Sequence, residues 1–161
     1  MTTAYVGIGS NVGERLEFCR DAVAALDDTE GIRVTATSGL YETTPVGGPP
    51  QRSFINLVAR LETTLGPRDL LATCQSIERV LGREPSEIRW GPRVVDLDVL
   101  LFGDEKVNEG DLEIPHPRMT QRRFVLVPLL EIDPDAADPW GSRYADWVDE
   151  AEGEVRLVEA F

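Results

Sequence analysis

The sequence has no apolar run near the roughly 20 residues that cross a bilayer, so we expect no membrane partner. Its opening residues, Met1 to Tyr5, are not a basic segment followed by an apolar stretch, and we expect a cytoplasmic protein without a secretory signal. Cysteine is scarce as well. Cys19 and Cys74 fall on the apolar stripes of expected helices, which favours buried, reduced thiols over a disulfide.

Basic residues other than arginine are almost absent, since Lys106 and His116 are the only lysine and the only histidine. The formal net charge of −13 repels nucleic-acid backbones, so we expect no nucleic-acid partner. Arginine offers a planar fork that suits phosphate oxygens, although a GC-rich coding bias also accounts for its excess over lysine.

Two common nucleotide-binding motifs are missing. The sequence contains no Walker segment Gly-x-x-x-x-Gly-Lys-Ser/Thr, which excludes a P-loop kinase. The glycines Gly7, Gly9 and Gly13 resemble a dinucleotide fingerprint, but the third comes one position late. Any nucleotide site must therefore be built differently.

A length of 161 residues with 42% hydrophobic residues suits one domain, 1–161, with a substantial core. Alternating apolar residues predict strands near 3–9, 32–41, 53–63 and 94–102, and helical spacing predicts helices near 14–27 and 67–81. A short pairing near 112–114, an apolar helix near 124–131, and a C-terminal helix and strand complete the expectation. The order of the first six elements indicates an α+β, ferredoxin-like sandwich, with helices on one face of a mainly antiparallel sheet.

Two aspartates interrupt the most apolar expected strand. Asp96 and Asp98 are two positions apart, so both should project from one face, roughly 6–7 Å apart. At an effective dielectric near 20 their repulsion is about 2.5 kcal/mol, which a cation would offset. Mg²⁺ prefers one or two carboxylates together with substrate phosphates. The alternative is a pair of ordinary surface acids.

The segment before this strand favours the metal interpretation. Arg89 and Arg93 flank Trp90-Gly91-Pro92, whose Gly-Pro pair constrains the loop. Arginines beside metal-binding carboxylates are typical of polyphosphate transfer, where positioning and charge neutralisation supply most of the catalysis. A structural salt-bridge cluster of the same four charged residues is the competing interpretation.

The run Arg89-Trp90-Gly91-Pro92-Arg93-x-x-Asp96-Leu97-Asp98-Val99-Leu100 closely resembles the signature of the 6-hydroxymethyl-7,8-dihydropterin pyrophosphokinase family. Other segments agree along essentially the whole chain. They are Tyr5 to Asn11, Tyr41-x-Thr43-x-Pro45-x-Gly47, Phe54-x-Asn56, Gly82-Arg83, Pro115-His116-Pro117 and Arg122-x-Phe124.

This resemblance implies transfer of diphosphate from ATP to the pterin hydroxymethyl group, releasing AMP as part of folate biosynthesis. Asp96 and Asp98 would bind two Mg²⁺ ions, and catalysis would use these two residues with Arg83 and Arg93. The residues implied to bind ATP are Gln75, Glu78, Arg89, Trp90, Arg93, Val99, His116 and Arg122. Those implied to bind the pterin are Thr43, Thr44, Val46, Phe54, Asn56 and Phe124, with the two phenyl rings enclosing the flat ligand. We expect a monomer.

The sequence departs from the family pattern where basic residues are common. Glu84-Pro85-Ser86-Glu87 follows Arg83, and position 111 is aspartate. These residues cannot bind phosphate, which bears on ATP affinity. We still expect residues 84–93 to be mobile without ligand and to close over bound ATP.

Two alternatives remain at this point. Another metal-dependent phosphoryl or nucleotidyl transferase on the same sandwich would keep Asp96 and Asp98 but would need no slot formed by Phe54, Asn56 and Phe124. A non-catalytic, ferredoxin-like ligand-binding domain would need neither the paired carboxylates nor the neighbouring arginines.

Overall fold

The computed structural model describes residues 1–45, 48–82 and 94–161. Its strands are β1 (Thr2–Ser10), β2 (Ile32–Thr37), β3 (Leu40–Thr43), β4 (Phe54–Thr63), β5 (Asp96–Phe102), β6 (Val107–Glu109), β7 (Leu112–Ile114) and β8 (Val155–Glu159). Its helices are α1 (Arg15–Asp27), α2 (Pro67–Val80) and α3 (Arg123–Ile132), with 3-10 turns at Met119–Gln121 and Tyr144–Asp146. None of the described helices is long and apolar enough to cross a bilayer.

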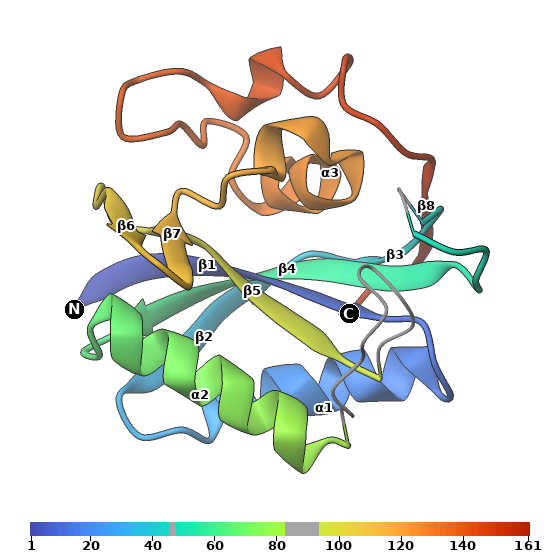
Figure 1. The fold of residues 1–161 in the computed structure, drawn as a ribbon, viewed down its shortest axis with the longest axis horizontal. Coiled ribbons are helices and arrows are strands. Elements are labelled where there is room, and N and C mark those ends of the chain that lie inside the picture. The colour runs from blue at the N-terminus through green and yellow to red at the C-terminus, as the bar shows by residue number, and fades with distance from the viewer. Residues whose placement is uncertain (46–47, 83–93) are drawn as a thin grey trace.

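One six-stranded sheet forms the centre of the molecule (Figure 1). Its strand order is β5-β1-β4-β3-β8, and β2 also pairs with β4. All of these pairings are antiparallel. With β1 between β5 and β4, the arrangement is that of a ferredoxin-like sandwich, which confirms the predicted fold class.

Helices α1 and α2 cover one face of the sheet (Figure 1). The predicted stripes meet there: Leu26 of α1 and Leu70 of α2 pack with Val6, Ile8 and other residues of the alternating strands. Cys19 and Cys74 are buried free thiols in this core, as predicted. Burial raises the pKa of each thiol to about 12, so both are protonated and inert at neutral pH.

The two helices of the predicted sandwich thus share one face as expected, and the third helix, α3, packs on the opposite face (Figure 1). Val58 and Leu101 are apolar on that side of the sheet, and they pack against Leu126 and Leu129 of α3. The sheet is thus covered on both faces over part of its length. Beside the part that α3 covers, the same face carries Asn56, Asp96 and Asp98.

The single strand expected at 32–41 is two strands. Between β2 and β3, the hydroxyl of Ser38 accepts the Val58 N–H at 3.0 Å, and the Gly39 N–H donates to the Glu131 carboxylate at 3.1 Å. The Ser38 hydroxyl replaces the backbone carbonyl that would accept the Val58 N–H in a regular pair, while the Ser38 N–H still donates to Val58 O at 2.9 Å. Tyr41 also donates a hydrogen bond to Glu131, so the break is fastened to α3.

The expected C-terminal helix is also wrong. Only the 3-10 turn at Tyr144–Asp146 is found, followed by β8. Pro139 and Gly141, whose φ is +94°, shape the preceding segment into a turn in which the Asp138 carboxylate accepts two backbone N–H groups at 2.9 Å. The predicted C-terminal strand is confirmed as β8.

Candidate active site

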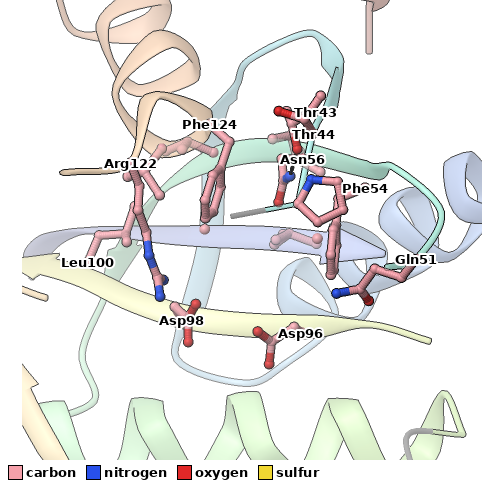
Figure 2. Close-up of a pocket in the computed structure, with 17 residues that line it drawn as sticks. Thr43, Thr44, Gln51, Phe54, Asn56, Asp96, Asp98, Leu100, Arg122 and Phe124 are labelled. Atoms are coloured by element: carbon pink, nitrogen blue, oxygen red, sulfur yellow. Dashed lines mark hydrogen bonds between the residues drawn. The ribbon is translucent and has the colours of Figure 1, made fainter. Parts of the chain in front are cut away.

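A pocket of about 160 Å³ lies on the α3 face of the sheet, where the ends of β1, β4 and β5 meet β3 and the start of α3 (Figure 2). It brings together every predicted pterin residue that the structure describes, and with them both aspartates and one predicted ATP residue. These are Thr43, Thr44, Phe54, Asn56 and Phe124, Asp96 and Asp98, and Arg122.

The two aspartates line this pocket from β5, which confirms that they project from one face of their strand. Leu97 and Val99, between and beyond them, are buried in the core on the other face. A bulge at Leu100 shifts the pairing of β5 with β1, so Leu100 and Leu101 both belong to the α3 side. The strand therefore carries carboxylates to the pocket at one end and core residues at the other.

The carboxylates suit a hard cation. They offer oxygen ligands from neighbouring positions of a rigid strand, and they open onto a pocket large enough for additional ligands. No third acidic, histidine or cysteine ligand joins them among residues 1–45, 48–82 and 94–161. A pair of carboxylates completed by substrate phosphates is the usual arrangement for Mg²⁺.

Glycines form the floor between the carboxylates and the predicted pterin residues. Gly9 lies opposite Asp96 on one side and Asn56 on the other, and Gly7 lies opposite Asp98. A Cβ atom at Gly9 would lie 2.4 Å from Asn56 Oδ1, which is far too close. Gly7 and Gly9 were not among the predicted site residues. Their alternation with buried Val6 and Ile8 was the available signal, because it leaves one strand face without side chains.

Asn56 is the buried polar centre of the pocket, 8% exposed. Its Nδ2 donates to Thr43 Oγ1 at 2.7 Å, which orients the amide. One amide hydrogen and the carbonyl oxygen have no further bond to the described parts of the chain, so they are available to a ligand. The amide can thus both donate to and accept from a single planar partner.

Two aromatic rings flank this amide. Figure 2 shows Phe54 and Phe124 on either side of Asn56, with the Arg122 guanidinium extending from α3 toward Asp98. The Arg122 Cζ lies 5.4 Å from the centroid of the Phe124 ring. Burial lowers the pKa of Arg122, whereas the charges of Asp98 and Asp96 oppose that change. The guanidinium therefore links the aromatic part of the pocket to the carboxylates.

The other predicted ATP residues that the structure describes are Gln75, Glu78, Val99 and His116, and none of them lines this pocket. Gln75 is exposed on α2, and Val99 is 5% exposed in the core beneath β5. Glu78 is 4% exposed, and its Oε2 accepts the backbone N–H of Leu97 at 2.9 Å. Leu97 is the residue between the two aspartates, so Glu78 holds the backbone that carries them.

Glu78→Ala should lower the free energy of unfolding by about 2 kcal/mol, because it leaves the buried Leu97 N–H without its acceptor. Glu78→Gln, which keeps an oxygen acceptor, should lose less. Urea unfolding measures both, with Gln75→Ala as the control from the exposed face of the same helix, expected within about 0.5 kcal/mol of the parent. Equal losses at positions 75 and 78 would contradict this role for Glu78.

His116 lies next to the charged groups of the site. Burial, together with Arg122 and Arg118, lowers the pKa of His116 to about 4, although Asp96 acts in the opposite direction. The ring is therefore neutral at physiological pH. Its Nδ1 accepts the Arg118 N–H at 3.2 Å, which leaves Nε2 as the protonated nitrogen and a hydrogen-bond donor.

Several predicted residues lie outside the described parts of the chain. These are Val46, Arg83, Arg89, Trp90 and Arg93, and the expected closure of residues 84–93 over ATP falls there too. Position 111 is described: Asp111 accepts a hydrogen bond from Arg68 at 2.8 Å in a surface ion pair. The acidic residue at this position therefore has a partner within the chain.

Comparisons with known proteins show which sequences and structures this chain resembles. The model of the 7,8-dihydro-6-hydroxymethylpterin-pyrophosphokinase family matches residues 5–134. The 2-amino-4-hydroxy-6-hydroxymethyldihydropteridine pyrophosphokinase of Bacillus subtilis is 48% identical over 129 residues, which are 80% of this chain and 77% of the relative. The enzyme of the same name from Methylorubrum extorquens is 47% identical over 135 residues, 84% of this chain and 85% of the relative.

A solved structure supports the fold independently. The crystal structure of wild-type Plasmodium falciparum HPPK-DHPS with pteroate matches with a TM-score of 0.73 at 14% identity, covering 92% of this chain and 42% of that chain. The present chain thus spans less than half of that protein. The match over residues 5–134 and the identities to the two bacterial enzymes show that the chain belongs to the 7,8-dihydro-6-hydroxymethylpterin-pyrophosphokinase family.

Proposed function

We propose that the protein transfers diphosphate from ATP to the hydroxymethyl group of 6-hydroxymethyl-7,8-dihydropterin, in a Mg²⁺-dependent reaction of folate biosynthesis. The observation that carries this proposal is that Phe54, Asn56 and Phe124 line the same pocket as Asp96 and Asp98. A carboxylate pair alone would suit many transferases, and an aromatic slot alone would suit many binding proteins.

The pterin end of the pocket suits a flat, amide-bearing heterocycle. Phe54 and Phe124 supply ring faces for stacking, and the buried Asn56 amide supplies one donor and one acceptor for the edge of the ligand. Thr43 holds Asn56, and Thr44 lines the adjacent wall. A ring held in this slot would have its hydroxymethyl substituent directed toward the carboxylates.

The carboxylate end of the pocket suits the diphosphate. Asp96 and Asp98 would hold two Mg²⁺ ions, which when bound neutralise phosphate charge and make a nearby hydroxyl easier to deprotonate. Arg122 lies beside Asp98 and would offset negative charge on the phosphate oxygens. Neutral His116 would donate a hydrogen bond to phosphate and would not act as a base.

In the proposed reaction the hydroxymethyl group loses its proton to solvent water, and its oxygen forms a bond to the β-phosphorus of ATP. The bond between that phosphorus and the oxygen bridging it to the α-phosphate breaks, and AMP leaves with this oxygen. Gln75 and Glu78 on α2, and Val99 on β5, are proposed to serve the nucleotide. Val46, Arg83, Arg89, Trp90 and Arg93 keep the roles that the family resemblance implies for them.

A coupled assay for AMP tests the proposal. Protein, ATP, Mg²⁺ and the pterin together should yield AMP, and leaving out any one of the three small components should prevent it. Folded protein that forms no AMP under these conditions, or forms it equally well without the pterin, would overturn the proposal.

A further inference from the structure

The pterin pocket has two walls on separate elements of the chain. Thr43 is the last residue of β3 and Thr44 follows it directly, whereas Arg122 and Phe124 stand at the start of α3. Residues 148–156 link these walls, since they run from the α3 layer down to β8 at the edge of the sheet (Figure 1). This segment lies beyond residues 5–134, where the family model matches.

Arg123 binds this segment to the wall formed by Arg122 and Phe124. Its guanidinium donates to three backbone carbonyls: Val148 O at 3.1 Å, Asp149 O at 2.8 Å and Gly153 O at 3.4 Å. Its own backbone N–H donates to Glu152 O at 3.0 Å. Arg123 does not line the pocket, although both of its neighbours, Arg122 and Phe124, do.

The same segment is also bound to the wall formed by Thr43 and Thr44. The Thr44 N–H donates to Glu154 O at 3.1 Å, and the Glu154 N–H donates to Thr44 Oγ1 at 3.0 Å. Directly afterwards, β8 pairs with β3, with Val155 opposite Thr43. Arg156 supports this pairing through a 2.7 Å ion pair with Glu42. Gly153, which Arg123 binds, and Glu154, which Thr44 binds, are consecutive residues, so the two walls are joined through a single peptide bond.

We propose that Arg123 is a positioning residue for pterin binding, because it sets the spacing between the Phe124 wall and the Thr44 wall through residues 148–154. This inference rests on the proposed function, which places the pterin in this pocket. Loss of the Arg123 hydrogen bonds would let the two walls move apart. A flat ligand held between them would then lose contact area and hydrogen-bond geometry.

Arginine is well suited to this role. Each of its three guanidinium nitrogens donates to a different carbonyl, with bonds strengthened by the positive charge. A lysine ammonium keeps the charge but is compact and cannot span the same set of acceptors. A methionine keeps the apolar stem and donates nothing.

The test compares Arg123→Met and Arg123→Lys with Arg143→Gln as control. Arg143 belongs to the same C-terminal region, but its exposed guanidinium pairs with Asp135 at 2.9 Å, away from the pocket. In Arg123→Met we expect KM and Kd for 6-hydroxymethyl-7,8-dihydropterin to rise about tenfold, with kcat and the KM for ATP within about twofold of the parent. Arg123→Lys should give about a threefold rise, and Arg143→Gln no change. Amide hydrogen exchange should quicken at residues 44 and 148–154 in the Arg123 variants only.

Two outcomes would overturn the inference: an unchanged pterin Kd in both Arg123 variants, or an equal rise in the constants for both substrates. If Arg123→Met does not fold, Arg123→Lys decides between the same results. Failure of the proposed function is distinguishable, because the parent protein itself would then neither bind the pterin nor form AMP.

Discussion

Asp96→Ala and Asp98→Ala are each expected to lower the rate of diphosphate transfer by on the order of 1,000-fold, which corresponds to about 4 kcal/mol of transition-state stabilisation. Each substitution removes one of the two carboxylates that face the pocket, and these are the oxygen ligands proposed for Mg²⁺. AMP formation at saturating ATP and pterin measures the effect. Titration with Mg²⁺ should show that added metal restores only part of the lost rate.

The same variants should remain folded. Removing one of two like charges from neighbouring positions relieves repulsion, and the core contacts of Leu97 and Val99 lie on the other face of the strand. Melting temperatures should therefore stay within a few degrees of the parent. Asp104→Ala is the matched control, since Asp104 is exposed in the turn just after β5 and should retain full activity. Full activity in a folded Asp96→Ala or Asp98→Ala protein would refute the assignment of that carboxylate.

Gly9→Ala is expected to weaken pterin binding by on the order of 100-fold. The added methyl group would lie 2.4 Å from Asn56 Oδ1 and 3.6 Å from a ring carbon of Phe54, so the amide must move. Displacement costs the ligand about two hydrogen bonds at roughly 1.4 kcal/mol each, and every 1.4 kcal/mol is about tenfold in affinity. Titration of the pterin against the variant, followed by fluorescence, measures the change in Kd.

Gly7→Ala provides the matched comparison two residues earlier on the same face. There the new methyl group would meet Leu100 side-chain carbons at 3.5 Å, which is ordinary contact. The loss of pterin affinity should be at least tenfold smaller than for Gly9→Ala. Because neither glycine has a positive φ, backbone strain does not separate the two cases. Similar losses at both positions would mean that general crowding of the floor, and not displacement of Asn56, is responsible.

Local pattern was sufficient for much of the fold. A period of two put Ile55 and Leu57 in one core and Asn56 on the opposite face, and helical spacing identified the buried stripes of α1 and α2. The same period put Asp96 and Asp98 on one face of β5. These properties depend on backbone geometry within a few residues, so a single segment carries the information.

Local pattern failed where the answer depended on a distant partner. The side of the sheet that α3 covers depends on which strand faces are apolar, and Val58 and Leu101 are far from Leu126 in the sequence. The break between β2 and β3 depends on Glu131, about 90 residues away. Neither contact changes the hydrophobic spacing within the segment whose structure it affects.

The same distinction between local pattern and distant contacts applies to the candidate site. Period and residue type placed Asp96 and Asp98 on one strand face and indicated a metal and phosphate site, whereas the pterin and the reaction were implied only by the resemblance of the motifs to the family. Tertiary structure alone brings Gly9 beneath Asn56, puts Glu78 behind Leu97, and ties Arg123 to residues 148–153. Those relations depend on strand register and on contacts between segments far apart in sequence, which no local periodicity encodes.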